Sequence, residues 1–203
     1  MRTPIAAGFA LSLLAGCALL PSDAPKATAD LASTKGSTVH GTVNFVEGRF
    51  GVQVYAAFSG LKPNSEFGFH LHEAGDCSSG DGMSAKGHFN PYSQPHAQAG
   101  MPQRHAGDLP SIRSDANGNA TLVAKLDVIT VSPGPASVID RGVIVHAQAD
   151  DFTTQPTGNA GARSACGVVK AYTPPVEGKK PAAEKPAAVK PAAEKPAAGP
   201  EKK

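Results

Sequence analysis

Short segments of alternating apolar and polar residues, separated by turn residues, constrain the fold of this chain most strongly. In residues 38–46, for example, Val39, Val43 and Phe45 share one face, as in a half-buried strand. Many short strands joined by turns predict an all-β sandwich or barrel. The other segments with strand character are residues 27–33, 49–58, 66–72, 111–114, 121–126, 142–146 and 166–172.

Turn residues bound most of these segments. Glu47-Gly48 and Ser59-Gly60 close two of them, and the pair Asn117-Gly118 predicts a hairpin turn. The 22 Gly, 18 Pro and absence of Trp fit a chain of strands and turns better than one of long helices. Two long irregular stretches, 73–107 and 147–163, interrupt the pattern, and long loops inside a compact domain usually carry function.

The first seventeen residues are predicted to be a targeting segment. Arg2 precedes an apolar run over residues 5–14 that is too short to span a bilayer. The sequence Leu14-Ala-Gly-Cys17 resembles the lipobox of bacterial lipoproteins, in which the cysteine carries lipid. Lipid on Cys17 would hold the protein on a membrane without spanning it. Ala18 after the cysteine resembles the signal that sorts such proteins to the outer membrane, so we expect the periplasmic side of the envelope. An ordinary signal peptide, with Cys17 incidental, is the alternative.

Two cysteines, Cys77 and Cys166, remain after Cys17 is set aside. An even pair in an exported protein favours a disulfide over two free thiols. Closing a loop of about 90 residues would stabilise the fold by roughly 4–5 kcal/mol in the chain-entropy model.

The C-terminal residues 174–203 are of low complexity. Four copies of Lys-Pro-Ala-Ala-X begin at Lys180; a proline every fifth residue blocks a long helix, and the composition offers no core. We expect a disordered spacer here, a linker at 18–26 and one domain at 27–173. Residues 177–203 carry seven Lys and four Glu, whereas residues 27–173 carry ten basic and twelve acidic residues. A mildly acidic domain argues against nucleic-acid binding.

Six of the seven histidines suggest metal chemistry. His70 and His72 are two apart on a predicted strand, so both rings can reach one ion. His88, His96 and His105, followed by Asp108, lie in the glycine-rich loop, and three histidines with a carboxylate suit tetrahedral zinc. His146 ends a strand that could bring it beside His70 and His72, and nitrogen-only ligation suits copper.

These motifs, in this order, resemble the copper,zinc superoxide dismutase family over residues 27–172. The stretches that carry the resemblance are Gly68-Phe-His-Leu-His-Glu-Ala-Gly-Asp-Cys77, Gly87-His-Phe-Asn-Pro91, Arg104-His-Ala-Gly-Asp-Leu109, Val145-His146 and Gly158-Asn-Ala-Gly-Ala-Arg-Ser-Ala-Cys-Gly167. The resemblance implies a Greek-key β-barrel of about eight antiparallel strands, flattened like an Ig-like sandwich. It also implies an oxidoreductase that dismutates superoxide to oxygen and hydrogen peroxide by alternating reduction and oxidation of copper bridged to zinc.

The resemblance also implies a role for each site residue, with one copper and one zinc ion per subunit. His88 would bridge the two ions and supply a proton, Asp150 would link a copper histidine to a zinc histidine, and Arg163 would attract the anion. Cys77 and Cys166 match the family's internal disulfide. The copper ligands would be His70, His72, His88 and His146, and the zinc ligands His88, His96, His105 and Asp108.

Other interpretations stay open at this point. A non-catalytic copper- or zinc-binding envelope protein would need the ligands alone, and a passive anchor for the C-terminal repeat would need none of them. The loop from His146 to Arg163 is shorter and less charged than in the familiar animal enzymes, so long-range steering is in question. A homodimer is not decided by the sequence. We expect His40 to be exposed, Arg104 to be a solvated loop charge and Tyr92 to pack within its loop.

Overall fold

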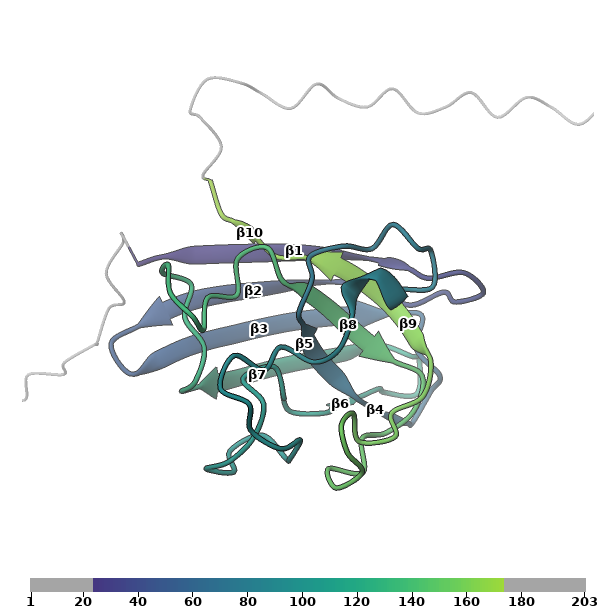
Figure 1. Cartoon of the computed structure of the whole chain (residues 1–203). Helices are drawn as coiled ribbons and strands as arrows, with labels where there is room; N and C mark the ends of the chain where they lie inside the picture. Colours follow the sequence, from purple (N-terminus) through teal and green to yellow (C-terminus); the bar gives the residue numbers. More distant parts are fainter. Residues whose placement is uncertain (1–23, 174–203) are drawn as a thin grey trace, which may run out of the picture. The chain divides into compact units, whose positions relative to one another are not determined.

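The computed structural model describes residues 24–173 as an all-β domain (Figure 1). The predicted signal segment and the C-terminal repeat lie outside the described residues. The strands are β1 (Lys26–Ser33), β2 (His40–Gly48), β3 (Gly51–Ser59), β4 (Glu66–Phe67), β5 (Phe69–His72), β6 (Ile112–Arg113), β7 (Ala120–Leu126), β8 (Gly142–His146), β9 (Arg163–Val168) and β10 (Lys170–Ala171), with one 3₁₀ turn, η1 (Met83–Ala85).

Eight strands form one curled antiparallel sheet. Its order is β5-β8-β9-β1-β2-β3-β7, with β10 pairing the start of β1, and β4 pairs β6 separately. Strand β1 joins the two halves of the sheet, because its first residues pair with β2 and its last two, Ala32 and Ser33, pair with β9. The predicted flattened barrel of about eight antiparallel strands is confirmed.

Alternation along the strands places the core inside the barrel. On β3, Val52, Val54, Ala56 and Phe58 are buried, whereas Tyr55 is 41% exposed, as expected for side chains that alternate between faces. The buried apolar residues of β1, β2, β3 and β7 belong to one continuous cluster. This cluster supplies the rigid support on which the loops are held.

Two strand predictions and one hairpin prediction need correction. The single strand expected over 66–72 is divided at Gly68, whose backbone instead bonds Gln148 and His146. The strand expected over 166–172 is likewise divided, because Val169 bonds Asp140 and Arg141. Asn117-Gly118 does form a turn, closed by the N–H of Asp115 on the carbonyl of Asn119. The flanking strands, however, pair with β4 and β3 and not with each other, so it is no hairpin.

The two long loops lie on the β5–β8–β9 side of the barrel. The Cys77–Cys166 disulfide, with a Cα–Cα distance of 5.8 Å, ties the first loop to β9. Backbone bonds from Leu71 to Gly107, and from Phe89 to Leu71, fix its later part against β5. In the second loop, the backbone N–H of Ala147 donates to the carbonyl oxygen of Ala162, and this bond fixes the loop. Both loops are therefore anchored to the β5, β8 and β9 strands.

Candidate metal centre

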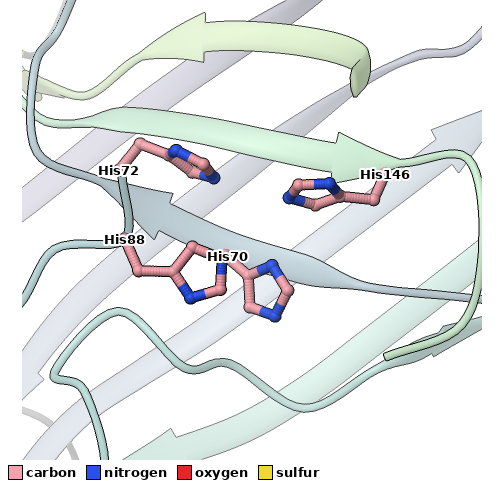
Figure 2. A group of neighbouring side chains, drawn as sticks. All are labelled: His70, His72, His88 and His146. Atoms are coloured by element: carbon pink, nitrogen blue, oxygen red, sulfur yellow. The ribbon is translucent and has the colours of Figure 1, made fainter. Parts of the chain in front are cut away.

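Four buried histidines meet on the outer face of the β5–β8 pair (Figure 2). His70 and His72 both leave the same face of β5, and His146 ends the neighbouring strand β8. His88 comes from the loop, which an isolated antiparallel bridge to His72 holds in place. One ring nitrogen from each residue lies within 4.8 Å of the others. The convergence predicted for these four residues is present.

One nitrogen of each ring is held, and the other has no protein partner. His72 Nδ1 lies 2.9 Å from the carbonyl oxygen of Lys86, and His146 Nδ1 lies 3.2 Å from that of Gly161. Because a carbonyl oxygen only accepts, both Nδ1 atoms carry the proton, and each Nε2 lone pair is free. The unpartnered buried atoms are His70 Nδ1, His72 Nε2, His88 Nε2 and His146 Nε2.

These four atoms fit a copper ion. Buried polar atoms normally have a hydrogen-bond partner, so four unpartnered nitrogens facing one another indicate a ligand of another kind. A set of four imidazole nitrogens suits copper, one of several transition metals that imidazole binds well.

A second buried group centres on Asp108. Its Oδ1 atom lies 3.0, 2.9 and 3.3 Å from the Nδ1 atoms of His88, His96 and His105, respectively. Its Oδ2 atom accepts the backbone N–H groups of Ala97 and His105 at 3.0 and 2.9 Å, which fixes the carboxylate. Three nitrogens and one oxygen around one point fit tetrahedral zinc. His88 belongs to both groups.

Asp150 connects the two groups through one histidine of each. Its Oδ2 lies 2.7 Å from His70 Nε2, and its Oδ1 lies 3.0 Å from His96 Nε2. The N–H of Phe152 donates to the same Oδ1 at 2.7 Å. Gly158 makes room, because a Cβ there would lie 1.8 Å from Asp150 Oδ1, and its φ is +63°. The carboxylate can thus orient one ring of each group.

Burial sets the charge of the histidines. It lowers the pKa of His72 well below the usual value, that of His88 to about 4 and that of His146 to about 3. Burial alone would also lower the pKa of His96, but hydrogen bonds to Asp108 and Asp150 outweigh it and raise the pKa to about 9. At neutral pH the rings of His72, His88 and His146 are therefore neutral and free to ligate.

The two aspartates stay ionised. Burial alone would raise the pKa of Asp108, but hydrogen bonds from His105, His88 and His96 lower it far below its ordinary value. Bonds with His70 and His96 outweigh burial in the same way and lower the pKa of Asp150. Each centre therefore adjoins a negative charge.

Arg163 begins β9 directly opposite His146. Its guanidinium donates to the carbonyl oxygens of Gly82 at 2.6 Å and Lys86 at 2.5 Å. Burial lowers the pKa of Arg163, yet a guanidinium stays charged in proteins. The Lys86 carbonyl accepts from both Arg163 and His72, so it couples the cation to the four-histidine group.

The structure also tests the expectations for the residues outside the two groups. His40 is exposed at the start of β2, as expected. Arg104 is not a solvated charge: it is 5% exposed and donates to Asp127, which directly follows β7, so that expectation was wrong. Tyr92 is 51% exposed and does not pack as expected. The carbonyls of Lys86 and Gly161 were missed, because backbone acceptors leave no mark in the side-chain pattern.

Comparison with known proteins gives the family. Residues 39–169 match the model of the copper/zinc superoxide dismutase (SODC) family. The protein named superoxide dismutase [Cu-Zn] 2 of Aquifex aeolicus (strain VF5) is 37% identical over 149 residues, which cover 71% of this chain and 86% of the relative. The superoxide dismutase [Cu-Zn] of Paramecium bursaria Chlorella virus 1 is 42% identical over 137 residues, 64% of this chain and 72% of the relative.

A solved structure is also similar to this chain. The crystal structure of the clock protein EA4 superposes with a TM-score of 0.66 and 38% sequence identity, covering 72% of this chain and 94% of that one. The chain therefore belongs to the copper/zinc superoxide dismutase family, as its motifs suggested.

Proposed function

We propose that this chain dismutates superoxide to oxygen and hydrogen peroxide at a paired copper and zinc centre. The family membership supports the reaction and both metals. His70, His72, His88 and His146 would hold copper, and His88, His96, His105 and Asp108 would hold zinc. The observation that carries these roles is the set of four unpartnered ring nitrogens next to the Asp108 group.

The chain's own residues supply binding, orientation and a proton. When bound, copper supplies the one-electron chemistry and zinc a fixed positive charge. Arg163 offers a permanent positive charge and several donors to a small anion. His88 belongs to both groups, and its Nδ1 faces Asp108 whereas its Nε2 has no protein partner. Its Nε2 is therefore the atom at which this chain can hold a proton and release it to the product. Asp150 keeps the rings of His70 and His96 from rotating.

The non-catalytic alternative is not favoured. A metal-storage protein would have no use for Arg163, which two carbonyl oxygens hold beside the copper ligands. The relatives are also named as superoxide dismutases.

The experiment is metal analysis of the purified chain together with a superoxide-consumption assay. We expect one copper and one zinc per chain, activity that disappears on chelation and activity that returns only when copper is restored. His40→Ala, which removes an exposed histidine outside both groups, should change neither metal content nor rate. A fully loaded chain without superoxide consumption would leave the non-catalytic alternative standing.

For localisation we propose export, lipid on Cys17 and attachment to the periplasmic face of the outer membrane. The Cys77–Cys166 disulfide supports an oxidising compartment. Among residues 24–173 there is no helix long and apolar enough to cross a membrane. Replacing Cys17 with Ser should move the protein from the membrane fraction to the soluble envelope fraction. Unchanged partitioning would count against the lipid.

A further inference from the structure

We propose that the end of the barrel formed by the β2–β3 turn is a docking surface for an anionic phospholipid bilayer. This proposal builds on the lipid anchor proposed at Cys17 and adds the face that the anchored domain presents. Its central residue is Phe50, in the turn between β2 and β3. Phe50 is 71% exposed, more than any other large hydrophobic side chain in the part of the chain that the structure describes.

Cations surround this aromatic ring. Arg49 Cζ and Lys125 Nζ each lie 5.4 Å from the ring centroid of Phe50. Lys26, the exposed first residue of β1, pairs with Val46 just before the turn. An exposed ring among cations is the composition of an interfacial anchor, in which the ring enters the headgroup region and the cations meet lipid phosphates.

The acidic groups at this end are already engaged. Glu47 Oε2 accepts the backbone N–H groups of Val131 and Ser132 at 2.8 and 2.5 Å. Asp127 is paired with Arg104 at 2.5 Å. Lys26, Arg49 and Lys125 have no ion-pair partner among residues 24–173, so this end carries excess positive charge on a domain that is acidic overall.

Two hollows flank Phe50. One of about 190 Å³ is lined by Arg49, Phe50, Gln53 and Lys125, and one of about 320 Å³ by Phe50, Pro110, Lys125 and Leu126 among others. Each is several times the volume of about 30 Å³ that a water molecule occupies in the liquid. A phosphate headgroup can therefore lie beside the ring and reach Lys125.

The path of the chain points this end at the membrane. The carbonyl of Pro25 accepts the N–H of Glu47 at 2.9 Å, so the chain enters the domain beside the β2–β3 turn (Figure 1). Eight residue steps separate Cys17 from Pro25, a reach of at most about 28 Å. Figure 1 shows the end of β8 and the start of β9, which carry His146 and Arg163, at the opposite end of the barrel. A docked domain would therefore leave its metal centre facing away from the bilayer.

The chain has no tryptophan, so a single indole can report on this surface. Phe50→Trp would place it in the turn, and His40→Trp would place it at the exposed far end of β2, about 27 Å away at ~3.4 Å per residue. Both full-length variants are mixed with vesicles of phosphatidylglycerol and phosphatidylcholine, or of phosphatidylcholine alone. We expect a blue shift and quenching by brominated lipid for Phe50→Trp on the anionic vesicles, and neither for His40→Trp. Equal responses at the two positions would overturn the proposal.

Paired charge variants test the cations. Arg49→Ser with Lys125→Ser should weaken binding to anionic vesicles about 25-fold, at about fivefold per cation. Lys35→Ser with Lys62→Ser removes the same charge at the opposite ends of β1 and β3 and should change binding little. Equal losses in the two pairs would indicate net charge and would overturn a defined surface.

Repeating the fluorescence measurement with Cys17→Ser separates the two proposals. If the membrane fraction is lost but the indole at position 50 still responds to anionic vesicles, the anchor matters and the surface is real. If Cys17→Ser changes nothing and the response persists, the anchor is wrong and the surface stands. A lipid-held protein whose indole at position 50 never responds would keep the anchor and overturn the surface.

Discussion

Asp150 holds His70 and His96 through its two carboxylate oxygens, at 2.7 and 3.0 Å. One ring belongs to the four-histidine group and the other to the Asp108 group, so a single side chain sets the orientation of a ligand in each. A carboxylate can accept from both rings at once.

Asp150→Asn should therefore weaken both centres while leaving the fold intact. An amide of the same shape has only one acceptor oxygen, so at least one ring loses its partner. We expect metal affinity to fall about 10- to 100-fold, measured by competition with chelators. Asp151→Asn is the matched control, because that exposed carboxylate bonds only its own loop. Equal affinities in the two variants would contradict a linking role for Asp150.

The metal-free protein should become less stable as the pH falls below about 6.5. Folding lowers the pKa of His88 to about 4 and that of His146 to about 3. Between those values and about 6.5, the ordinary pKa of histidine, the unfolded chain binds protons that the folded chain does not.

His96 acts in the opposite sense, because its pKa is raised to about 9. Its contribution is present below about 6.5 and is lost as the pH rises toward 9. Denaturant unfolding of the metal-free chain across pH 4–9 should thus show maximal stability near pH 6–7. Stability that rises steadily from neutral pH down to pH 4 would contradict this assignment.

Arg163 should control anion capture without controlling metal content. Arg163→Ala should lower the second-order rate about tenfold or more, and Arg163→Glu should lower it further, because charge steering contributes 10- to 1000-fold in clefts of one sign. Copper and zinc should remain bound in both variants. The wild-type rate should fall with rising ionic strength, and the slope should flatten or reverse for Glu. Arg113→Ala, on an exposed arginine paired with Glu66, is the control; identical rates and slopes throughout would remove Arg163 from the reaction.

The disulfide should stabilise both the fold and the loop that holds Arg163. Cys77 and Cys166 are 89 residues apart in sequence, so Cys77→Ser with Cys166→Ser should lower the free energy of unfolding by roughly 4–5 kcal/mol. Gly82 and Lys86, which bind the Arg163 guanidinium, lie in the same loop. The rate of superoxide consumption should therefore fall even in the fully metal-loaded double variant, which stopped-flow assays can measure. A free energy of unfolding equal to that of the wild type would contradict the predicted stabilisation.

Local patterns were enough to predict most of the strands and to single out the histidines and Asp108 as candidate metal ligands, whereas the place of His88 in both groups came from the family resemblance. Period-2 alternation works for β3 because one of its faces is buried throughout. The histidine spacing works because His70 and His72 share one strand face, and the loop carries His88, His96 and His105 in a short stretch. These properties depend on neighbours in sequence.

Long-range partners account for what the sequence did not reveal. Arg104 is buried because Asp127, 23 residues away, receives its guanidinium. The 66–72 segment is divided because Gly68 bonds Gln148 and His146. Lys86 adopts a positive φ of 64°, and its carbonyl joins His72 to Arg163. No side-chain pattern in the sequence predicts this backbone contact.

The most direct test of the two-centre assignment compares metal content in His146→Ala and His105→Ala. Each variant removes a ligand from one group only. We expect His146→Ala to keep zinc, lose copper and no longer consume superoxide, whereas His105→Ala should lose zinc first and keep copper. Metal content is measured by mass spectrometry on the purified proteins, with superoxide consumption alongside. Retention of copper and near-normal turnover in His146→Ala, or the same metal loss in both variants, would contradict the two-centre assignment.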